Sequence, residues 1–367
     1  MNGRANPALH VRSVACTPIE VPLRYVLGTS AATVRAAPLL LVELLTEEGV
    51  VGRSYVFAYR HSGAKSIALL LQDAVELIAG DAVAPVAIAA RLQRRFALIG
   101  VTGLTRMALS ALDMALWDAL AISLQQPLTC LLGGTPRPVR AYNSCGLGLM
   151  SPQAAADEAE ALLEGGMRAV KLRLGHPTLA EDLAVTRAVR SRLPQEVELL
   201  VDYNQALSRV DALARGAALQ SEGVAWLEEP IRHDDLAGNA EIARALDLPL
   251  QLGENFDGPK DLLRALQAQA CDLVMPDVAR IGGVTGWMQA AGVAESHGIP
   301  MSSHLMPEVS AQLLAATATA HWLEYVDWTD AISSEPVKIV DGCWTIPQRP
   351  GTGFDWDAAA VARHRIA

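Results

Sequence analysis

The sequence lacks the features that mark nucleic-acid-binding and membrane-spanning proteins. Its 367 residues carry 40 acidic and 30 basic side chains, so no excess of positive charge is available for a nucleic-acid backbone or an anionic membrane. No uncharged apolar run reaches the roughly 18 residues of a membrane helix, because the densest, residues 36–45, contains Glu43. The first residues also lack the apolar core of a secretory signal.

Cysteine and lysine are scarce as well. The five cysteines are odd in number, scattered, and never spaced C-x-x-C, which argues against a disulfide framework and a zinc ribbon. Such usage is typical of a reducing compartment, so we expect a cytoplasmic globular protein. Only four of the 30 basic residues are lysines, which makes a lysine within an apolar segment informative.

Two regions with different spacing of apolar residues follow one another along the chain. The first 60 residues alternate like strands, and residues 62–132 have the apolar spacing of helices. The Gly-Gly-Thr-Pro sequence at residues 133–136 is a turn signal that ends this region. We therefore expect an N-terminal α+β domain over residues 1–136.

Beyond this boundary, short apolar runs alternate with helical patterns rich in alanine and leucine. The eight runs are residues 139–144, 168–174, 198–204, 224–230, 250–255, 272–277, 299–305 and 323–328. Short strands that alternate with helices predict a parallel, TIM-type (β/α) barrel, here over residues 137–330. Residues 331–367 have no helix-and-strand partner left, and we expect them to return to the first domain.

Three carboxylates recur at one interval within the predicted barrel. Asp202, Glu228 and Glu254 are each 26 residues apart, and each stands at the end of a predicted strand. Because the strand ends of a parallel barrel meet at its active-site face, the three should lie side by side. Adjacent carboxylates repel one another unless a cation joins them, and oxygen ligands suit Mg²⁺. The alternative for any one of them is a solvated loop acid.

Basic residues end the neighbouring strands. Lys171 and Arg173 share one face of a strand, either as site residues or as a pair that only neutralises the acids. Asp277 and His304 end two adjacent strands, and a carboxylate beside an imidazole makes a general base, although a structural histidine is the alternative. A divalent ion between these groups could hold a substrate carboxylate while a proton leaves the adjacent carbon.

These residues stand in segments that resemble the enolase superfamily, mandelate racemase subgroup. The resemblance spans essentially the whole chain and includes RAVKLRLG, VDYNQ, LEEP, GEN, MPD, IGGVTGW and IPMSSHL. It implies an N-terminal capping domain on a modified barrel, a small-molecule carboxylate substrate, and a homo-oligomer, commonly an octamer. By position it implies Asp202, Glu228 and Glu254 as Mg²⁺ ligands, with Asp277 and His304 as the base dyad.

The same resemblance implies further site residues and one departure. Lys171 would contact the substrate carboxylate, and Glu324 would be the electrophilic acid at its other oxygen. Ser144 and Asn204 match positions around the substrate and the metal. Arg173 stands where the racemase has a second lysine base. Deprotonation at neutral pH costs about 5 kcal/mol for lysine and about 8 kcal/mol for arginine, so Arg173 suits a racemase poorly.

Apolar residues of the cap match positions that line the racemase's substrate pocket. They are Leu27, Thr29, Ala31, Val34, Phe57 and Tyr59, with Leu305 and Val326 on the barrel. A polyol needs partners for its hydroxyls, so an apolar cap favours an aryl or alkyl 2-hydroxy acid over a sugar acid. The alternative is that these residues only pack the seam between the domains.

The sequence therefore predicts abstraction of the α-proton of a 2-hydroxycarboxylate through a metal-stabilised enediolate. Racemisation or epimerisation, as in mandelate racemase, is the leading hypothesis. The alternative is dehydration of an acid sugar by the His304/Asp277 dyad, because Arg173 is a poor second base. A non-catalytic binding protein on the same scaffold is a third hypothesis.

Overall fold

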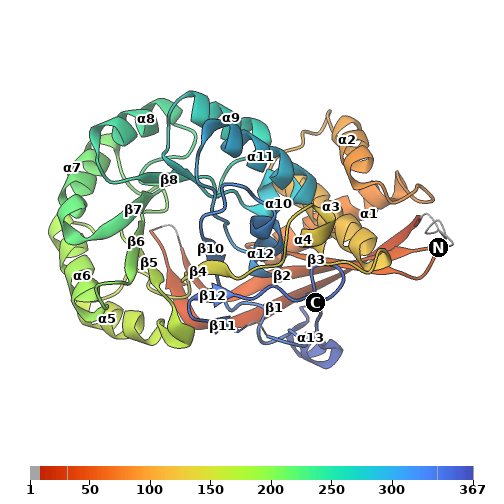
Figure 1. Cartoon of the computed structure of the whole chain (residues 1–367), viewed down its shortest axis with the longest axis horizontal. Coiled ribbons are helices and arrows are strands. Elements are labelled where there is room, and N and C mark those ends of the chain that lie inside the picture. The colour runs from red at the N-terminus through yellow and green to blue at the C-terminus, as the bar shows by residue number, and fades with distance from the viewer. Residues whose placement is uncertain (1–8, 31, 337, 367) are drawn as a thin grey trace.

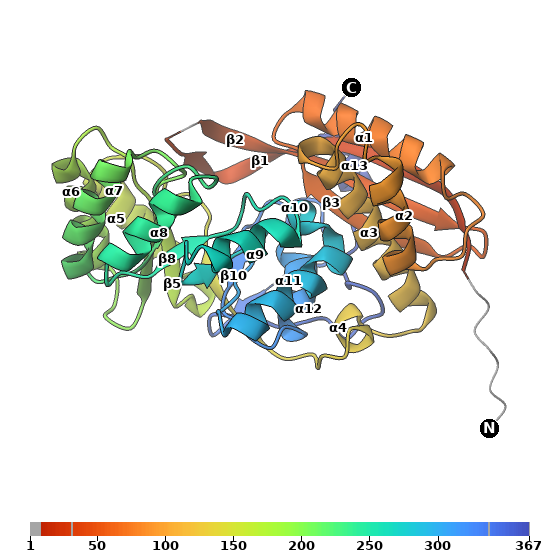
Figure 2. The same cartoon turned by 90° about the horizontal axis from the view of Figure 1, so that it is seen from above.

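The computed structural model describes residues 9–30, 32–336 and 338–366. An N-terminal domain of sheet and helices adjoins a (β/α) barrel, whose helices form an outer arc around the strands (Figure 1). Seen from above, strands of the N-terminal domain reach across toward the barrel helices (Figure 2). Within the described ranges, no helix combines the length and the apolarity needed to cross a membrane.

The N-terminal domain is a three-stranded antiparallel sheet packed against helices. Strand β1 (Val11–Gly28) pairs with β2 (Thr33–Thr46), which pairs with β3 (Val51–Phe57). The helices are α1 (His61–Glu76), α2 (Pro85–Arg95), α3 (Gly103–Ser123) and α4 (Leu128–Leu131). Gly52 on β3 lets α3 approach closely, because a Cβ there would overlap the carbonyl of Ala115.

The barrel strands coincide with the apolar runs of the sequence. They are β4 (Val139–Asn143), β5 (Ala169–Arg173), β6 (Glu198–Asp202), β7 (Val224–Glu228), β8 (Leu250–Leu252), β9 (Leu273–Val274) and β10 (Leu323–Tyr325). The order from β4 to β9 is sequential and parallel, and β10 pairs with β4. Residues 299–305 close the ring by single bridges, because Ser302 N bonds Val274 O and Ser303 N bonds Trp322 O.

Helices of the predicted type connect these strands. They are α5 (Pro152–Ala161), α6 (Leu179–Arg192), α7 (Arg209–Leu219), α8 (Leu236–Ala245), α9 (Pro259–Gln267), α10 (Val278–Ile281), α11 (Gly283–His297) and α12 (Pro307–Ala315), with 3₁₀ turns η1 (Glu164–Gly166) and η2 (Gln220–Glu222). Alternation of parallel strands with helices places every strand's carboxyl end at one face of the barrel.

The chain after the barrel divides between the two domains. The sequence predicted that residues 331–367 return to the capping domain, but β11 (Ile339–Val340) and β12 (Cys343–Trp344) instead extend the barrel sheet at β4. The reason is that β10 pairs with β4 only from Ala141 onward, which leaves an open edge at the start of β4. Farther on, α13 (Ala358–His364) packs on β1.

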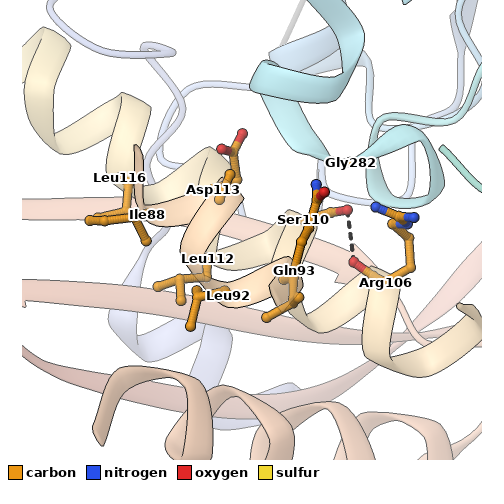
Figure 3. A pocket seen from close by; sticks show the side chains of 11 residues that line it. Ile88, Leu92, Gln93, Arg106, Ser110, Leu112, Asp113, Leu116 and Gly282 are labelled. Atoms are coloured by element: carbon orange, nitrogen blue, oxygen red, sulfur yellow. Dashed lines mark hydrogen bonds between the residues drawn. The ribbon is translucent and has the colours of Figure 1, made fainter. Parts of the chain in front are cut away.

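The seam between α3 and α11 depends on one buried acid. The N-cap residue of α11, Gly282, has no capping side chain, and Asp113 of α3 accepts hydrogen bonds from Thr285 N (2.9 Å) and Thr285 Oγ1 (2.6 Å) instead. Gly283 has φ +70°, and a Cβ there would overlap the Asp113 carboxylate. Figure 3 shows Asp113 and Ser110 on α3 in the small pocket that Gly282 also lines.

Candidate active site

Three carboxylates meet at the carboxyl ends of adjacent barrel strands. Asp202 and Glu228 are the last residues of β6 and β7, and Glu254 follows the end of β8 by two residues. One oxygen from each lies within 4.8 Å of the others, and we call these three residues the carboxylate cage. An all-oxygen set of this size fits a hard divalent cation.

Neighbouring side chains hold Glu228 in place on both oxygens. Its Oε1 accepts a hydrogen bond from Lys171 Nζ (2.8 Å), and its Oε2 accepts from Trp226 Nε1 (3.3 Å) and Gln251 Nε2 (3.2 Å). Trp226 and Gln251 were missed by the sequence reasoning. A polar glutamine inside the apolar run of residues 250–255 was the signal that could have identified one of them.

Asn204 adds an unused acceptor beside the cage. Its backbone N–H and Nδ2 donate to the two oxygens of Asp202 at 2.7 and 3.0 Å. Its own Oδ1 is buried and has no hydrogen-bond partner among the described residues. A buried orphan oxygen is costly unless a ligand satisfies it, so Asn204 supports a site for a cation or a donor group.

The charges of the cage are only partly compensated. Burial raises the pKa of Glu228 to about 8; Lys171 opposes this rise and Asp202 adds to it. Burial also raises the pKa of Asp202, again against the effect of Lys171. Acids that resist ionisation in this way need more positive charge than one ammonium group supplies, which is what a divalent cation would provide.

Lys171 and Glu324 lie together on the side of the cage formed by β5 and β10. Lys171 Nζ is 2.8 Å from Glu324 Oε1, which also accepts a hydrogen bond from Ser144 Oγ (2.7 Å). Glu324 Oε2 accepts from the backbone N–H of Leu305 (2.7 Å). Burial raises the pKa of Glu324, but Lys171 and His304 outweigh it and lower the pKa to about 2. Glu324 is therefore ionised in this arrangement.

His304 and Asp277 form the expected dyad. His304 Nδ1 lies 2.7 Å from Asp277 Oδ2, while Asp277 Oδ1 accepts from Ala279 N at the start of α10. The other ring nitrogen, Nε2, faces the cage and is 3.2 Å from Glu254 Oε2. Burial lowers the pKa of His304, but the carboxylates of Glu254 and Glu324 outweigh it and raise the pKa well above its usual range. Asp277 thus orients the imidazole so that Nε2 faces the cage, where its partner is the Glu254 carboxylate.

Arg173 is bound to the loop that follows β4. Its Nη1 donates to Gly146 O (2.9 Å), and its Nη2 donates to Ser144 Oγ (2.9 Å) and Ser144 O (3.3 Å). The side chain is 5% exposed. A guanidinium that is fixed by three acceptors orients the loop after β4, and it offers no lone pair to accept a proton.

The predicted pocket residues fall into three groups. Leu27 and Val34 face each other across the β1–β2 hairpin, whose tip reaches the barrel mouth, where Ser30 Oγ donates to Tyr203 O (3.2 Å) (Figure 2). Phe57 is buried against Trp328, with ring centroids 4.7 Å apart. Thr29 bonds Ala32 within the hairpin turn, where its Oγ1 accepts from Ala32 N (3.1 Å). Ala31 lies outside the described residues, and the other predicted residues are Tyr59, Leu305 and Val326.

Tyr59 and Leu305 have surroundings that the pocket prediction did not include. Tyr59 contacts Phe57 (ring centroids 4.3 Å apart), yet it is 44% exposed and lies over the guanidinium of Arg280 at 5.0 Å. Leu305 and Val326 are buried, and the backbone of Leu305 binds Glu324. Trp328 and Arg280 were missed by the sequence reasoning; an aromatic residue just after the last barrel strand was the available signal for Trp328.

The fold and the cage define a metal-dependent enzyme on a capped (β/α) barrel. Residues 11–133 match the mandelate racemase/muconate lactonizing enzyme N-terminal domain, and residues 154–360 match the enolase C-terminal domain-like family. The chain belongs to the mandelate racemase/muconate lactonizing enzyme family of the enolase superfamily.

Similar proteins have been described as a dehydratase and as enolase structures with bound ligands. L-talarate/galactarate dehydratase of Salmonella typhimurium is 31% identical over 348 residues, 93% of this chain and 87% of that protein. An enolase structure from alpha proteobacterium bal199 with bound magnesium is 43% identical, with a TM-score of 0.95 over 98% of this chain and all of the other. A Bradyrhizobium enolase complexed with magnesium and mandelic acid is 36% identical, with a TM-score of 0.94 over 98% and 99% of the two chains.

Proposed function

We propose that this enzyme removes the α-proton of a 2,3-dihydroxycarboxylate and eliminates the β-hydroxyl as water, which gives a 2-keto-3-deoxy acid. The observation that carries this proposal is the unequal state of the two candidate bases. His304 is oriented by Asp277 with Nε2 turned toward the cage, whereas Arg173 is bound to Ser144 and Gly146 and forms no ion pair with an acidic side chain among the described residues. One competent base suits a one-sided elimination better than racemisation.

The cage would hold Mg²⁺ through Asp202, Glu228 and Glu254, and the orphan oxygen of Asn204 and the uncompensated acids support this fit. Bound Mg²⁺ would supply a Lewis acid for the charge that develops on the substrate carboxylate. Lys171, which is buried and charged, would pair with that carboxylate from the other side. Solved relatives crystallised with magnesium support the choice of ion.

The proton balance can be followed at His304. With Glu254 serving as a metal ligand rather than as the partner of His304, the imidazole can be neutral. Its Nε2 then takes the α-proton, the electron pair of the C–H bond forms the new carbon–carbon double bond, and the β-carbon–oxygen bond breaks. The same imidazolium can return its proton to the departing hydroxyl, so water leaves and an enol remains. The enol becomes the 2-keto acid by gaining a proton at the former β-carbon and losing the one on its hydroxyl oxygen. No oxidant or reductant is needed.

Racemisation of a 2-hydroxy acid with an apolar side chain is the second candidate. Phe57, buried against Trp328, and Leu27, buried on the hairpin, support an apolar substrate group. The Bradyrhizobium relative with mandelic acid supports the same reaction class. A racemase would need a second base on the face of Arg173, and the hydrogen bonds of Arg173 oppose that role.

The test is proton NMR in D₂O with Mg²⁺, on a panel of 2,3-dihydroxycarboxylates and both mandelate enantiomers. We expect a 2-keto-3-deoxy product and no recovery of the opposite mandelate enantiomer. His304→Asn should lower turnover by about 10²–10⁴-fold, the usual contribution of a general base. His297→Asn, an exposed histidine at the end of α11, is the matched control and should retain activity.

Two results would contradict the proposal. Deuterium at Cα with both enantiomers recovered would make the enzyme a racemase. Full activity of His304→Asn on every substrate would remove the dyad from the mechanism. Arg173→Lys sharpens the distinction, because a large gain in racemisation would show that only the missing lysine prevented it.

Cellular location and assembly belong to the same proposal. All five cysteines are free, which supports a reducing, cytoplasmic location. A homo-oligomer is proposed from the family resemblance alone, and light scattering of the purified protein tests it.

A further inference from the structure

Glu308 is a buried acid that the proposed proton transfer does not use. It is the second residue of α12, and 6% of its surface is exposed. Its Oε2 accepts a hydrogen bond from the hydroxyl of Tyr55 (2.5 Å), and its Oε1 accepts one from the hydroxyl of Thr329. Burial raises the pKa of Glu308, and these two hydrogen bonds oppose the rise. Two neutral hydroxyl groups therefore hold this carboxylate in place.

The two hydroxyl groups come from separate parts of the molecule. Tyr55 belongs to β3 of the N-terminal domain, 253 positions before Glu308. Thr329 belongs to the loop after β10, 21 positions after Glu308. Both of these side chains are buried. One carboxylate thus joins the N-terminal domain to α12 and to the loop that follows the last barrel strand.

The same three segments carry residues of the candidate site. Phe57 is two positions after Tyr55 on β3, so their side chains lie on one face of the strand. Phe57 packs against Trp328, the residue before the threonine, with ring centroids 4.7 Å apart. Glu308 itself lies four positions after His304. Its hydrogen bonds therefore bring together the segments that place the general base and this aromatic pair.

A strained turn connects the general base to α12. Between His304 and the helix, Leu305 and Met306 have φ of +49° and +47°, a region that residues with side chains rarely adopt. The backbone N–H of Leu305 donates to Glu324 Oε2 (2.7 Å), and its carbonyl accepts from Ser310 Oγ of α12 (2.9 Å). Such a turn keeps its shape only where its surroundings hold it, so the place of the imidazole depends on where α12 lies.

We propose that Glu308 is a positioning residue that fixes α12 against the N-terminal domain and thereby sets the place of His304. The inference rests on the proposed function, because it takes His304 as the general base. Glu308 acts through the turn and not on the substrate. Tyr55 and Thr329 give this joint two attachments, so the loss of either hydroxyl loosens α12 in part.

The test is the NMR signal of the proton on His304 Nδ1, in Mg²⁺-loaded protein labelled with ¹⁵N-histidine. Nδ1 lies 2.7 Å from Asp277 Oδ2, and an ionised carboxylate only accepts hydrogen bonds, so this nitrogen carries the proton. The chemical shift of that proton depends on the length of the hydrogen bond. His304→Asn assigns the signal, because that variant lacks it.

Glu308→Gln keeps the size of the side chain and replaces one acceptor oxygen by an NH₂ group, so one hydroxyl loses its partner. We expect the Nδ1 signal to move upfield or to broaden beyond detection. Turnover of the 2,3-dihydroxycarboxylate that reacts fastest should fall about 10–100-fold with less than about a twofold change in KM, since a misplaced base slows the chemical step. Mg²⁺ affinity in calorimetry should be retained.

Smaller changes assign the effect to the two hydroxyls. Tyr55→Phe and Thr329→Val each remove one hydroxyl and keep the shape of the side chain, and each should displace the signal in part. Thr329→Ser keeps the hydroxyl and should keep the natural signal. Asp113→Asn is the matched control and should leave the signal unchanged, because Asp113 is a similarly buried acid that also accepts from a threonine hydroxyl. Thermal unfolding shows which variants have folded.

The proposal is overturned if the Nδ1 signal of Glu308→Gln matches that of the natural protein, or if those of Tyr55→Phe and Thr329→Val do so should Glu308→Gln not fold. It is also overturned if Asp113→Asn displaces the signal equally, since the loss of any buried acid would then explain the change. Failure of the proposed function has a different result. A displaced signal with unchanged turnover keeps the link between Glu308 and His304 but removes His304 as the base.

Discussion

Buried acids occur in two regions of this molecule, and their partners differ. In the carboxylate cage, Asp202 and Glu228 share Lys171, and the partly buried Glu254 lies against His304. On α3, Asp113 and Asp118 are equally buried, but each accepts hydrogen bonds from backbone N–H groups and a threonine hydroxyl. The carboxylates on α3 are satisfied by neutral hydrogen-bond donors. The negative charges of Asp202 and Glu228 are only partly neutralised by Lys171.

Burial raises pKa values in both regions, so a raised pKa alone does not separate function from structure. It raises the pKa of Asp113 to about 7, that of Asp118 to about 6 and that of Glu228 to about 8. The distinguishing observations are the crowding of three carboxylates and the unpaired oxygen of Asn204. A ligand site is therefore recognised by polar or charged groups that have no partner within the protein.

The largest expected effect is in the cage. Glu228→Gln keeps the shape of the side chain and removes one ligand charge, so Mg²⁺ affinity in calorimetry should fall at least tenfold, and turnover about 100-fold or more. Asp113→Asn neutralises an equally buried acid on α3 and is the matched control, with Mg²⁺ affinity retained within about twofold. Equal losses of Mg²⁺ affinity in the two variants would show that the cage acids are not the metal ligands.

A smaller effect, on stability, is expected at the seam. Asp113→Ala leaves the N–H and hydroxyl of Thr285 without their acceptor, so the free energy of unfolding should fall by about 1–3 kcal/mol. Urea unfolding measures this change. Glu228→Gln removes a repelling charge and should leave the unfolding free energy of the metal-free protein unchanged or higher. An undiminished stability of Asp113→Ala would show that the seam does not depend on this acid.

The smallest expected effect is a difference in pH dependence. The folded pKa of Asp113, about 7, lies above the unfolded value of 3.8, so the folded state binds the proton more tightly. Its contribution to stability is present below about pH 4 and is lost as the pH rises toward 7. Asp113→Asn should therefore lose less stability than the natural protein between pH 4 and 7. Parallel stability curves for the two proteins would contradict this assignment.

The barrel and its cage could be predicted because their determinants are local. Apolar runs located the strands, and the rule that strand ends share one face was enough to bring Asp202, Glu228 and Glu254 together. The pairing of His304 with Asp277 followed from the same rule. The strand expected at residues 299–305 is less regular than its neighbours, since only single bridges hold it.

Other features depend on backbone geometry that the pattern of residues does not encode. Arg173 is bound by carbonyls of the loop after β4, where Gly146 and Leu147 have φ of +58° and +45°. The pairing of β12 with β4 depends on how far β10 extends along the same strand. Arg280 escaped notice because its partners, Asn255 and Tyr59, come from distant parts of the chain that only the folded structure brings together.

Asp118 also bears on the order in which the protein can be completed during synthesis. Its oxygens accept hydrogen bonds from Arg53 N and from Thr352 N, and Thr352 lies 234 residues farther along the chain. The ribosome therefore synthesises the capping domain long before it synthesises Thr352, which completes the hydrogen bonds of Asp118 inside that domain. Until residue 352 emerges, two of the three hydrogen bonds to the Asp118 carboxylate cannot form, so the interior of the first domain to be synthesised is completed only near the end of synthesis.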